Sequence, residues 1–291
     1  MCTSSWFFHP NGYSLFFNRD EKRTRAIAQP PKVIRTDNGM AIMPTDPDGG
    51  GTWLGVNSSG WTYALLNYYQ GQIPSGALTS RGTIVKQALN CETNDQVAHL
   101  FNKLPMSRFA PFSFLCIAPT HTAAQHKPAE QQEGSDTILL WRWTGTMLYR
   151  LPVKGIITSS SVHFEQACAT RMQNATQMNI LNNDPIKSPH SCNSGNLNAQ
   201  ALVNGFENGL KNGLDDRALR HHAFHSSHEP QCGATSVCMH REDARTVSLS
   251  EITSSRGQVQ FRYFDGPPCK VDAPVVQELQ LNPSQSVNQV A

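Results

Sequence analysis

The opening of the chain constrains its fold more than any other stretch. Two β-prone aromatic segments, SSWFF and YSLFF, flank the tetrapeptide His9-Pro10-Asn11-Gly12. Turn residues in a short connection between two such segments indicate an antiparallel hairpin. The sequence therefore predicts that the chain begins with two paired strands, and that the polar residues after YSLFF return close to Cys2.

Strand signals recur at both ends of the chain and helix signals lie between them. Strands are predicted in GMAIMPT, TWLGV, WTYALLNYY, FSFLCIA, the hairpin TILLWRW/MLYRLPV, TSVCMH, TVSLSEI and VQFRYF. Helices are predicted in TIVKQALN, NDQVAHLFNKL with Asn94 as its cap, SVHFEQACATRMQNA and RALRHHAFHSS. This grouping predicts an α+β fold of two facing antiparallel sheets with helices outside them, and not a doubly wound one. The strand that starts at Cys2 is expected near the middle of its sheet.

The domain boundaries follow from length and polarity. A chain of 291 residues can form one large domain. We predict a single domain over residues 1–276 and a polar, flexible tail over residues 277–291. From Asn182 the chain is polar, and three glycines make a helix in LVNGFENGLKNGL costly.

Composition excludes several classes of function. The net charge is +2 and charged residues make up 16% of the chain, so nucleic acid is not an expected partner. No apolar stretch reaches the roughly 20 residues of a membrane span, and no signal peptide is recognisable. The eight cysteines are scattered, which predicts unpaired thiols in a cytoplasmic protein.

Cys2 is the residue with the most suggestive chemistry. Removal of Met1 would leave one residue with both a thiol and a free α-amine, which is a minimal pair of nucleophile and base. The predicted hairpin brings Asn18-Arg19-Asp20-Glu21 back toward that terminus. A guanidinium near Cys2 would lower the thiol pKa, and a carboxylate near the α-amine would orient it. A solvated turn at the end of a strand would carry the same residues.

Four places in the sequence resemble the NRDE family, which is named for its Asn-Arg-Asp-Glu motif and includes transport and Golgi organisation protein two of animals. They are Met1-Cys2, FFNRDE, the block GGTWLG with Asn67 after it, and TSSS before a helix that contains Arg171. The animal members imply a carrier or trafficking protein that binds an apolar cargo, such as haem or an acyl lipid, without turnover.

A more distant resemblance links the chain to choloylglycine hydrolases and penicillin V acylases, which are cysteine N-terminal-nucleophile amidases. It implies a four-layer αββα sandwich and hydrolysis of a non-peptide amide in a linear substrate. It also implies that Cys2 is the nucleophile, Asp20 holds its α-amine and Asn67 donates to the oxyanion, while Arg19 completes the catalytic set. Asn18, Gly51, Trp53 and Ser159 are then expected to contact substrate.

The chain departs from the amidase pattern at several positions. Those enzymes place an arginine three residues before the aspartate, where this chain has Phe17. Arg19 and Asp20 are adjacent, so on a strand their side chains point to opposite faces. Ser159 and Ser160 stand where the amidases have a second asparagine.

No cofactor and no metal is expected from the sequence. His221, His222, His225 and His228, followed by Cys232, Cys238 and His240, form a histidine-rich and cysteine-rich stretch. Its spacing matches no structural zinc pattern. The glycines of DPDGGGTWLG lack the Gly-Lys-Ser/Thr of a phosphate loop and are expected to form a rim near the terminus.

Overall fold

The computed structural model describes residues 1–119, 137–153, 155–181 and 215–282. The predicted opening hairpin is confirmed: β1 (Cys2–His9) pairs antiparallel with β2 (Gly12–Lys22), and Cys2 lies opposite Arg19. The turn requires glycine at position 12, where φ is +155° and an added Cβ would lie 1.9 Å from the carbonyl oxygen of Ser254.

Two antiparallel sheets form the body of the described chain. The first has the order β10-β1-β2-β11-β12-β13 and the second runs β3-β4-β5-β6-β7-β8-β9. The additional strands of the first sheet are β10 (Ile156–Ser159), β11 (Ala244–Ser255), β12 (Gln258–Phe264) and β13 (Val275–Gln280). Those of the second are β3 (Gln29–Thr36), β4 (Gly39–Thr45), β5 (Leu54–Asn57), β6 (Thr62–Asn67), β7 (Phe112–Ile117), β8 (Ile138–Trp143) and β9 (Leu148–Leu151).

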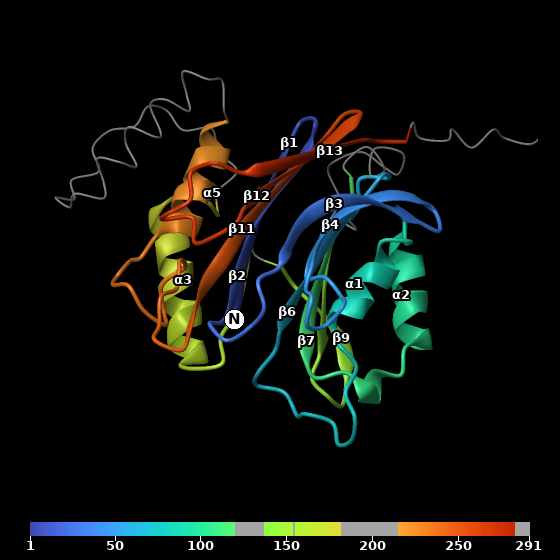
Figure 1. Ribbon diagram of the computed structural model, residues 1–291, viewed down its shortest axis with the longest axis horizontal. Helices are drawn as coiled ribbons and strands as arrows, with labels where there is room; N and C mark the ends of the chain where they lie inside the picture. Colours follow the sequence, from blue (N-terminus) through green and yellow to red (C-terminus); the bar gives the residue numbers. More distant parts are fainter. Residues whose placement is uncertain (120–136, 154, 182–214, 283–291) are drawn as a thin grey trace, which may run out of the picture.

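Helices cover the outer face of each sheet, as Figure 1 shows. On one side α3 (Phe164–Gln177) and α5 (Asp216–Ser226) lie against the first sheet. On the other side α1 (Gly82–Ala88) and α2 (Asn94–Lys103) lie against the second sheet, and the short 3₁₀ helix η1 (Met106–Arg108) follows. The four-layer αββα arrangement with antiparallel sheets is therefore confirmed.

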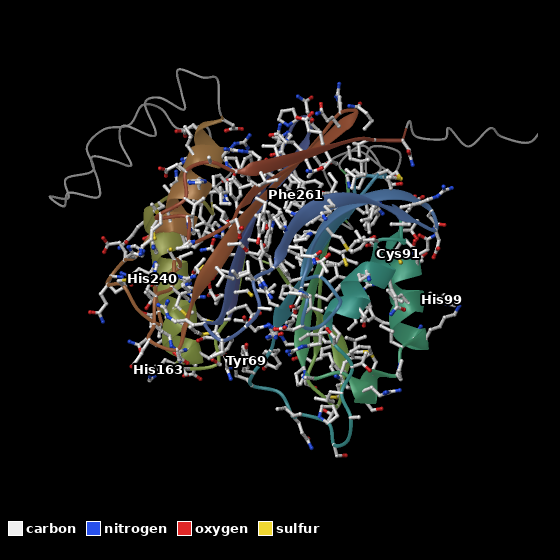
Figure 2. All side chains as sticks on the ribbon, in the orientation of Figure 1. Tyr69, Cys91, His99, His163, His240 and Phe261 are labelled. Carbon is white, nitrogen blue, oxygen red and sulfur yellow. The ribbon has the colours of Figure 1, made fainter. Side chains whose placement is uncertain are left out.

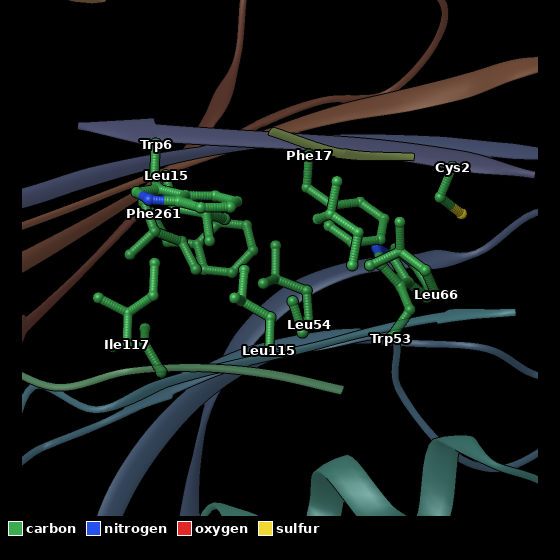
Figure 3. Close-up of a cluster of buried hydrophobic side chains, with 14 of the residues drawn as sticks. Cys2, Trp6, Leu15, Phe17, Trp53, Leu54, Leu66, Leu115, Ile117 and Phe261 are labelled. Atoms are coloured by element: carbon green, nitrogen blue, oxygen red, sulfur yellow. The ribbon is translucent and has the colours of Figure 1, made fainter. Parts of the chain in front are cut away.

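The largest apolar cluster lies between the sheets. Phe17 from β2 and Leu66 from β6 face one another across it, with Trp53 beside them and Cys2 at one end (Figure 3). Phe17 and Leu66 are fully buried. Burying each such side chain stabilises the fold by about 1.5–3 kcal/mol, so this layer fixes the position of the chain start.

Three strands, β3, β10 and β13, were not predicted from sequence. β3 contains Pro30-Pro31 and forms an edge of its sheet, where a missing backbone donor is tolerated. β10 is only four residues long and pairs with β1, so Cys2 lies opposite Ser159. As a result β1 is the second strand from an edge and not a central one.

Other expectations need correction. TSVCMH is not a strand, because the backbone amide of Cys238 donates to Ser227 O and that of Met239 to a side-chain oxygen, Thr246 Oγ1. Thr93, and not Asn94, caps α2 by accepting from the Gln96 amide. The predicted tail begins too early, because residues 277–280 belong to β13 and Leu279 packs on the central core. The stretch LVNGFENGLKNGL lies outside the described residues.

The thiols agree with the sequence prediction wherever the structure describes them. Seven cysteines are unpaired, and Cys192 lies outside the described residues. Within the described ranges, no helix combines the length and the apolar character needed to cross a membrane.

Candidate functional site at the chain start

The backbone of β1 positions Cys2 between two neighbouring strands. Cys2 lies opposite Arg19 of β2 and opposite Ser159 of β10. Its backbone N–H donates to Ser159 Oγ at 2.9 Å. Its thiol belongs to the apolar layer between the sheets, where Figure 3 shows it at the end of the row of core side chains.

Two polar groups accept hydrogen bonds from the α-ammonium of Met1. It donates to the backbone carbonyl of Asp20 at 3.2 Å and to the hydroxyl of Tyr69 at 3.3 Å. The same hydroxyl accepts from Asn67 Nδ2 at 2.9 Å. The Tyr69 hydroxyl thus bridges Asn67 and the chain start. Figure 2 shows Tyr69 on the side of the molecule where the chain begins in Figure 1.

Met1 itself is buried on the other face of the first sheet. Its side chain packs with Met239 and Ala244, and its sulfur accepts from Ser160 Oγ at 3.0 Å. The amide of Asp20 donates to Met1 O at 2.9 Å, so the β1–β2 pairing continues to the first residue.

Arg19 lies on the face that Cys2 also uses. Its guanidinium carbon is 4.1 Å from the ring centroid of Trp53. One guanidinium nitrogen lies 3.4 Å from a Glu21 carboxylate oxygen and 3.8 Å from one of Asp46. The positive charge is therefore already balanced by two carboxylates and an aromatic ring.

Asp20 points to the opposite face, as the strand alternation predicts. Its carboxylate accepts from Thr246 Oγ1 at 2.7 Å and lies 4.0 Å from the guanidinium of Arg171. Arg171 is fully buried and also donates to the hydroxyls of Thr3 and Thr158 at 2.7 and 2.6 Å. Because Met1 is present, the nitrogen of Cys2 is a peptide amide here. That the Asp20 carboxylate holds the α-amine of Cys2 therefore stays a prediction for the chain without Met1. The carbonyl of Asp20 holds the Met1 amine, and Ser159 contacts the nitrogen of Cys2.

Two of the residues predicted to contact substrate have structural partners within the chain. Asn18 is buried, and its Nδ2 donates to the carbonyls of His225 and Val237 at 2.8 and 3.1 Å. Gly51 packs closely against Gly82, since an added Cβ would lie 2.5 Å from the carbonyl carbon of Gly82. The backbones of these two glycines pack against each other and hold the start of α1 beside β5.

The electrostatics of Cys2 also differ from expectation. Burial raises the pKa of the Cys2 thiol to about 11, against the opposing effect of the nearby α-ammonium. The predicted lowering by Arg19 is therefore not found, since that guanidinium is occupied by Glu21 and Asp46. Burial opposes the charge of the α-ammonium itself, but nearby Cys2, Tyr69 and Asp20 outweigh it and raise its pKa.

Burial and ion pairing act in opposite directions on the pKa values of Asp20 and Arg171. Burial raises the pKa of Asp20, and Arg171 acts in the other direction. Burial lowers the pKa of Arg171, and Asp20 opposes that shift. Each charge therefore depends on the other to remain ionised in the interior.

The structure brings Cys2, Arg19, Trp53 and Ser159 together at one end of the apolar layer, and Tyr69 connects Asn67 to the chain start. Sequence reasoning missed Tyr69, which links Asn67 to the chain start, and Thr246, which holds the Asp20 carboxylate. The aromatic pair Tyr68-Tyr69 at the end of the predicted strand WTYALLNYY was the available signal for Tyr69. Thr246 had none, because it reaches Asp20 through the pairing of β2 with β11.

Known proteins resemble this chain through a family model and, more weakly, through overall structure. No curated protein matches the chain significantly. Among solved structures, two variants of conjugated bile acid hydrolase from Clostridium perfringens are similar over 100% of both chains, with TM-scores of 0.46 and 0.42 and identities of 10% and 12%. A Caenorhabditis elegans orthologue of N-acylethanolamine-hydrolyzing acid amidase covers 61% of this chain and 79% of its own, with a TM-score of 0.40 and 10% identity. Residues 1–190, which contain Cys2, the Asn18–Glu21 motif, Asn67 and Arg171, match the family described as Transport and Golgi organisation 2, and the chain belongs to that family.

Proposed function

We propose that the chain is an N-terminal-nucleophile amidohydrolase in which Cys2 becomes competent once Met1 is removed. The observation that carries this proposal is the hydrogen bond from the backbone nitrogen of Cys2 to Ser159 Oγ at 2.9 Å. That nitrogen would become the free α-amine, and it already has an oriented polar partner. The Asn67 amide lies one hydroxyl group away from the same terminus.

The proposed reaction uses a linear, non-peptide amide as its substrate. The α-amine of Cys2 accepts the thiol proton, and sulfur attacks the amide carbonyl to form a tetrahedral oxyanion that Asn67 stabilises. The amine then returns the proton to the leaving nitrogen, which departs as a free amine. Water hydrolyses the remaining thioester to the acid and restores the thiol.

The burial of Met1 sets the order of events. Its side chain packs under Met239 and Ala244 in the folded chain, so an aminopeptidase has no access to it there. Removal is expected during synthesis, before β11 covers the terminus. The seven unpaired cysteines of the described chain support a reducing, cytoplasmic compartment for this activity.

A second candidate function is a carrier of an apolar cargo. The raised thiol pKa of about 11 favours it, because a neutral buried thiol is a poor nucleophile while Met1 is present. In this case Arg19 stacked on Trp53 would form a wall of the binding site and Cys2 would have no chemical role.

Two preparations of the full chain, one starting at Met1 and one at Cys2, separate these functions. Chromogenic N-acyl 4-nitroanilides of increasing chain length are offered to both, and the acyl-enzyme is sought by intact mass. The enzyme proposal predicts turnover only in the chain that starts at Cys2, and loss of turnover in Cys2→Ser. Asn67→Ala is expected to lower the rate by roughly 10²-fold. Cys232→Ser, which changes an exposed thiol, is the matched control.

The carrier function predicts a different pattern. Hemin and a fluorescent fatty acid would bind the wild-type chain and Cys2→Ser equally, and neither preparation would cleave any anilide. Intact mass of the protein from its own host adds an independent test. A chain that retains Met1 there contradicts the enzyme proposal.

A further inference from the structure

A cluster of two thiols and two imidazoles lies outside the site at the chain start. It consists of His228, Cys238, His240 and Cys269, which we call the sulfur–imidazole cluster. One ligand atom from each residue lies within 4.8 Å of the other three. The four come from three separate segments, namely the stretch that follows α5, the loop before β11 and the turn after β12. Figure 2 shows His240 on the side of the molecule that carries α3.

The distances in the cluster are close to those of a tetrahedral metal site. With Zn–S bonds of about 2.3 Å and Zn–N bonds of about 2.0–2.1 Å, neighbouring ligand atoms lie roughly 3.3–3.8 Å apart. His240 Nε2 lies 3.6 Å from Cys238 Sγ and 3.3 Å from Cys269 Sγ. The ring centroids of His228 and His240 are 5.1 Å apart and the ring planes are tilted by 76°, which leaves room for a metal ion bound by both.

His228 gives a second, independent indication. Its Nε2 atom is buried and lacks a hydrogen-bond partner among the described residues. A buried nitrogen without a partner destabilises the fold, and coordination through this nitrogen would remove that cost. A metal would therefore satisfy a group that the protein otherwise leaves unsatisfied.

The backbone around the cluster is held in place by its own hydrogen bonds. The amide of Cys238 donates to the carbonyl of Ser227 at 2.9 Å, which places Cys238 beside the neighbouring His228. Ser236 Oγ donates to the carbonyl of Cys238 at 2.8 Å. On the third segment the Lys270 amide closes a turn to Pro267 O at 2.9 Å and thereby presents Cys269.

We propose that the sulfur–imidazole cluster binds a structural Zn²⁺ ion. Two thiolates and two imidazoles form the donor set of closed, four-coordinate zinc sites, which leave no position open for substrate. Binding replaces the two thiol protons, which pass to solvent, and no oxidation takes place. The sequence spacing hid this site, because Cys269 follows His240 by a whole β-hairpin, β11–β12.

The ion would also stabilise the segment that covers the chain start. Met239 lies between two of the ligands and packs on Met1. Its amide donates to Thr246 Oγ1 at 2.8 Å, and the same hydroxyl donates to the Asp20 carboxylate at 2.7 Å. Zinc at Cys238 and His240 would therefore fix both ends of the short segment that closes over Met1.

Metal content of the full-length protein tests the proposal first. After growth with added zinc and removal of loosely bound metal, elemental analysis is expected to find about one Zn²⁺ per chain. The double variant C238S/C269S is expected to lose it. Cys232→Ser changes a neighbouring exposed thiol outside the cluster and is expected to keep it. Equal zinc in the double variant and this control, or substoichiometric zinc in the wild type, would overturn the proposal.

Cobalt substitution tests the coordination geometry in the wild-type chain, so the result does not depend on whether a variant folds. Co²⁺ bound to the wild-type chain is expected to show thiolate charge-transfer bands and the intense visible bands of a tetrahedral ion, which added Zn²⁺ abolishes. An octahedral spectrum, tight binding of Cu⁺ with no Zn²⁺ affinity, or a mass two hydrogens lower from a Cys238–Cys269 disulfide would each contradict the proposal. The single variant Cys269→Ser, in a half-buried turn, gives a milder check of the same ligand set.

Discussion

The two faces of β2 at the Asn-Arg-Asp-Glu motif contrast sharply. On the face between the sheets, Arg19 stacks on Trp53 and lies opposite Cys2. On the face toward the helices, Asp20 pairs with the buried Arg171 and Asn18 binds two backbone carbonyls. The side chains of consecutive residues in one motif thus point toward different layers of the sandwich.

This difference separates two roles that a motif can combine. The helix-facing residues have buried partners that need them, so their loss leaves charges or carbonyls unsatisfied. The partners of Arg19 have alternatives, because Arg25 also contacts Glu21 and Asp46. We infer that half of the motif holds the sandwich together, while the other half is available to the site at Cys2.

Loss of the buried arginine is expected to have the largest effect. Arg171→Met leaves the Asp20 carboxylate buried without a counter-charge and should lower the free energy of unfolding by about 3–5 kcal/mol. Urea unfolding followed by circular dichroism measures this. Arg142→Met, which removes an arginine stacked on Tyr68 in the second sheet, is the matched control and should cost far less. Recovery of part of the loss in R171M/D20N would attribute it to the pair, and no recovery would contradict the pairing argument.

Suppressed reactivity of Cys2 is the next largest effect. The pKa of the Cys2 thiol is about 11, against an ordinary value near 9. At any pH below both values, the fraction of Cys2 present as thiolate is therefore about 100-fold lower than in an ordinary cysteine. In the chain that retains Met1, iodoacetamide should therefore modify Cys2 slowly at pH 8, and the rate should rise with pH toward 11. Mass mapping of each cysteine measures these rates. Once Met1 is absent, Cys2 should become the fastest thiol, and equal rates in both chains would contradict its role as a nucleophile.

The predictability of the fold depended on whether the signals were local. The opening hairpin, the hairpin of β8 and β9 and the amphipathic helices could be predicted, because each depends on a turn or a period within a short segment. β3 and β10 could not be predicted. Pro30-Pro31 is compatible with a strand only at an edge, and β10 owes its strand conformation to β1.

The same distinction applies to the candidate site. The hairpin register predicted that Arg19 returns to Cys2, and alternation predicted that Arg19 and Asp20 diverge. The partner of each side chain came from distant segments, such as Thr246 on β11 and Arg171 on α3. Burial of the thiol also depends on the second sheet, so its raised pKa had no signal in the first twenty residues.

Asn18 tests the helix-facing side at a smaller scale. Asn18→Ala leaves the carbonyls of His225 and Val237 without a donor and should lower the free energy of unfolding by roughly 1–3 kcal/mol. The control Asn38→Ala removes an exposed hydrogen bond from Asn38 Nδ2 to Asn90 O and should have little effect. A stable Asn18→Ala variant that has lost binding or turnover would instead place Asn18 in the functional site, against the division of faces.

Arg19 is expected to give the smallest change in stability and the clearest change at the site. Arg19→Gln removes the stacking on Trp53 and two ion pairs, but Arg25 still compensates Glu21 and Asp46. Arg19 is buried but its carboxylate partners are partly exposed, so the expected cost is about 1–2 kcal/mol in urea unfolding. The rate of alkylation or turnover at Cys2, measured in the chain that starts there, should change more clearly than the stability does. The reason is that the group opposite Cys2 has been replaced. Arg19→Lys keeps the charge without the planar stacking and separates these two contributions. If Arg19→Gln destabilises the protein as much as Arg171→Met, both faces of β2 are structural and the site at Cys2 loses its neighbouring guanidinium as a functional group.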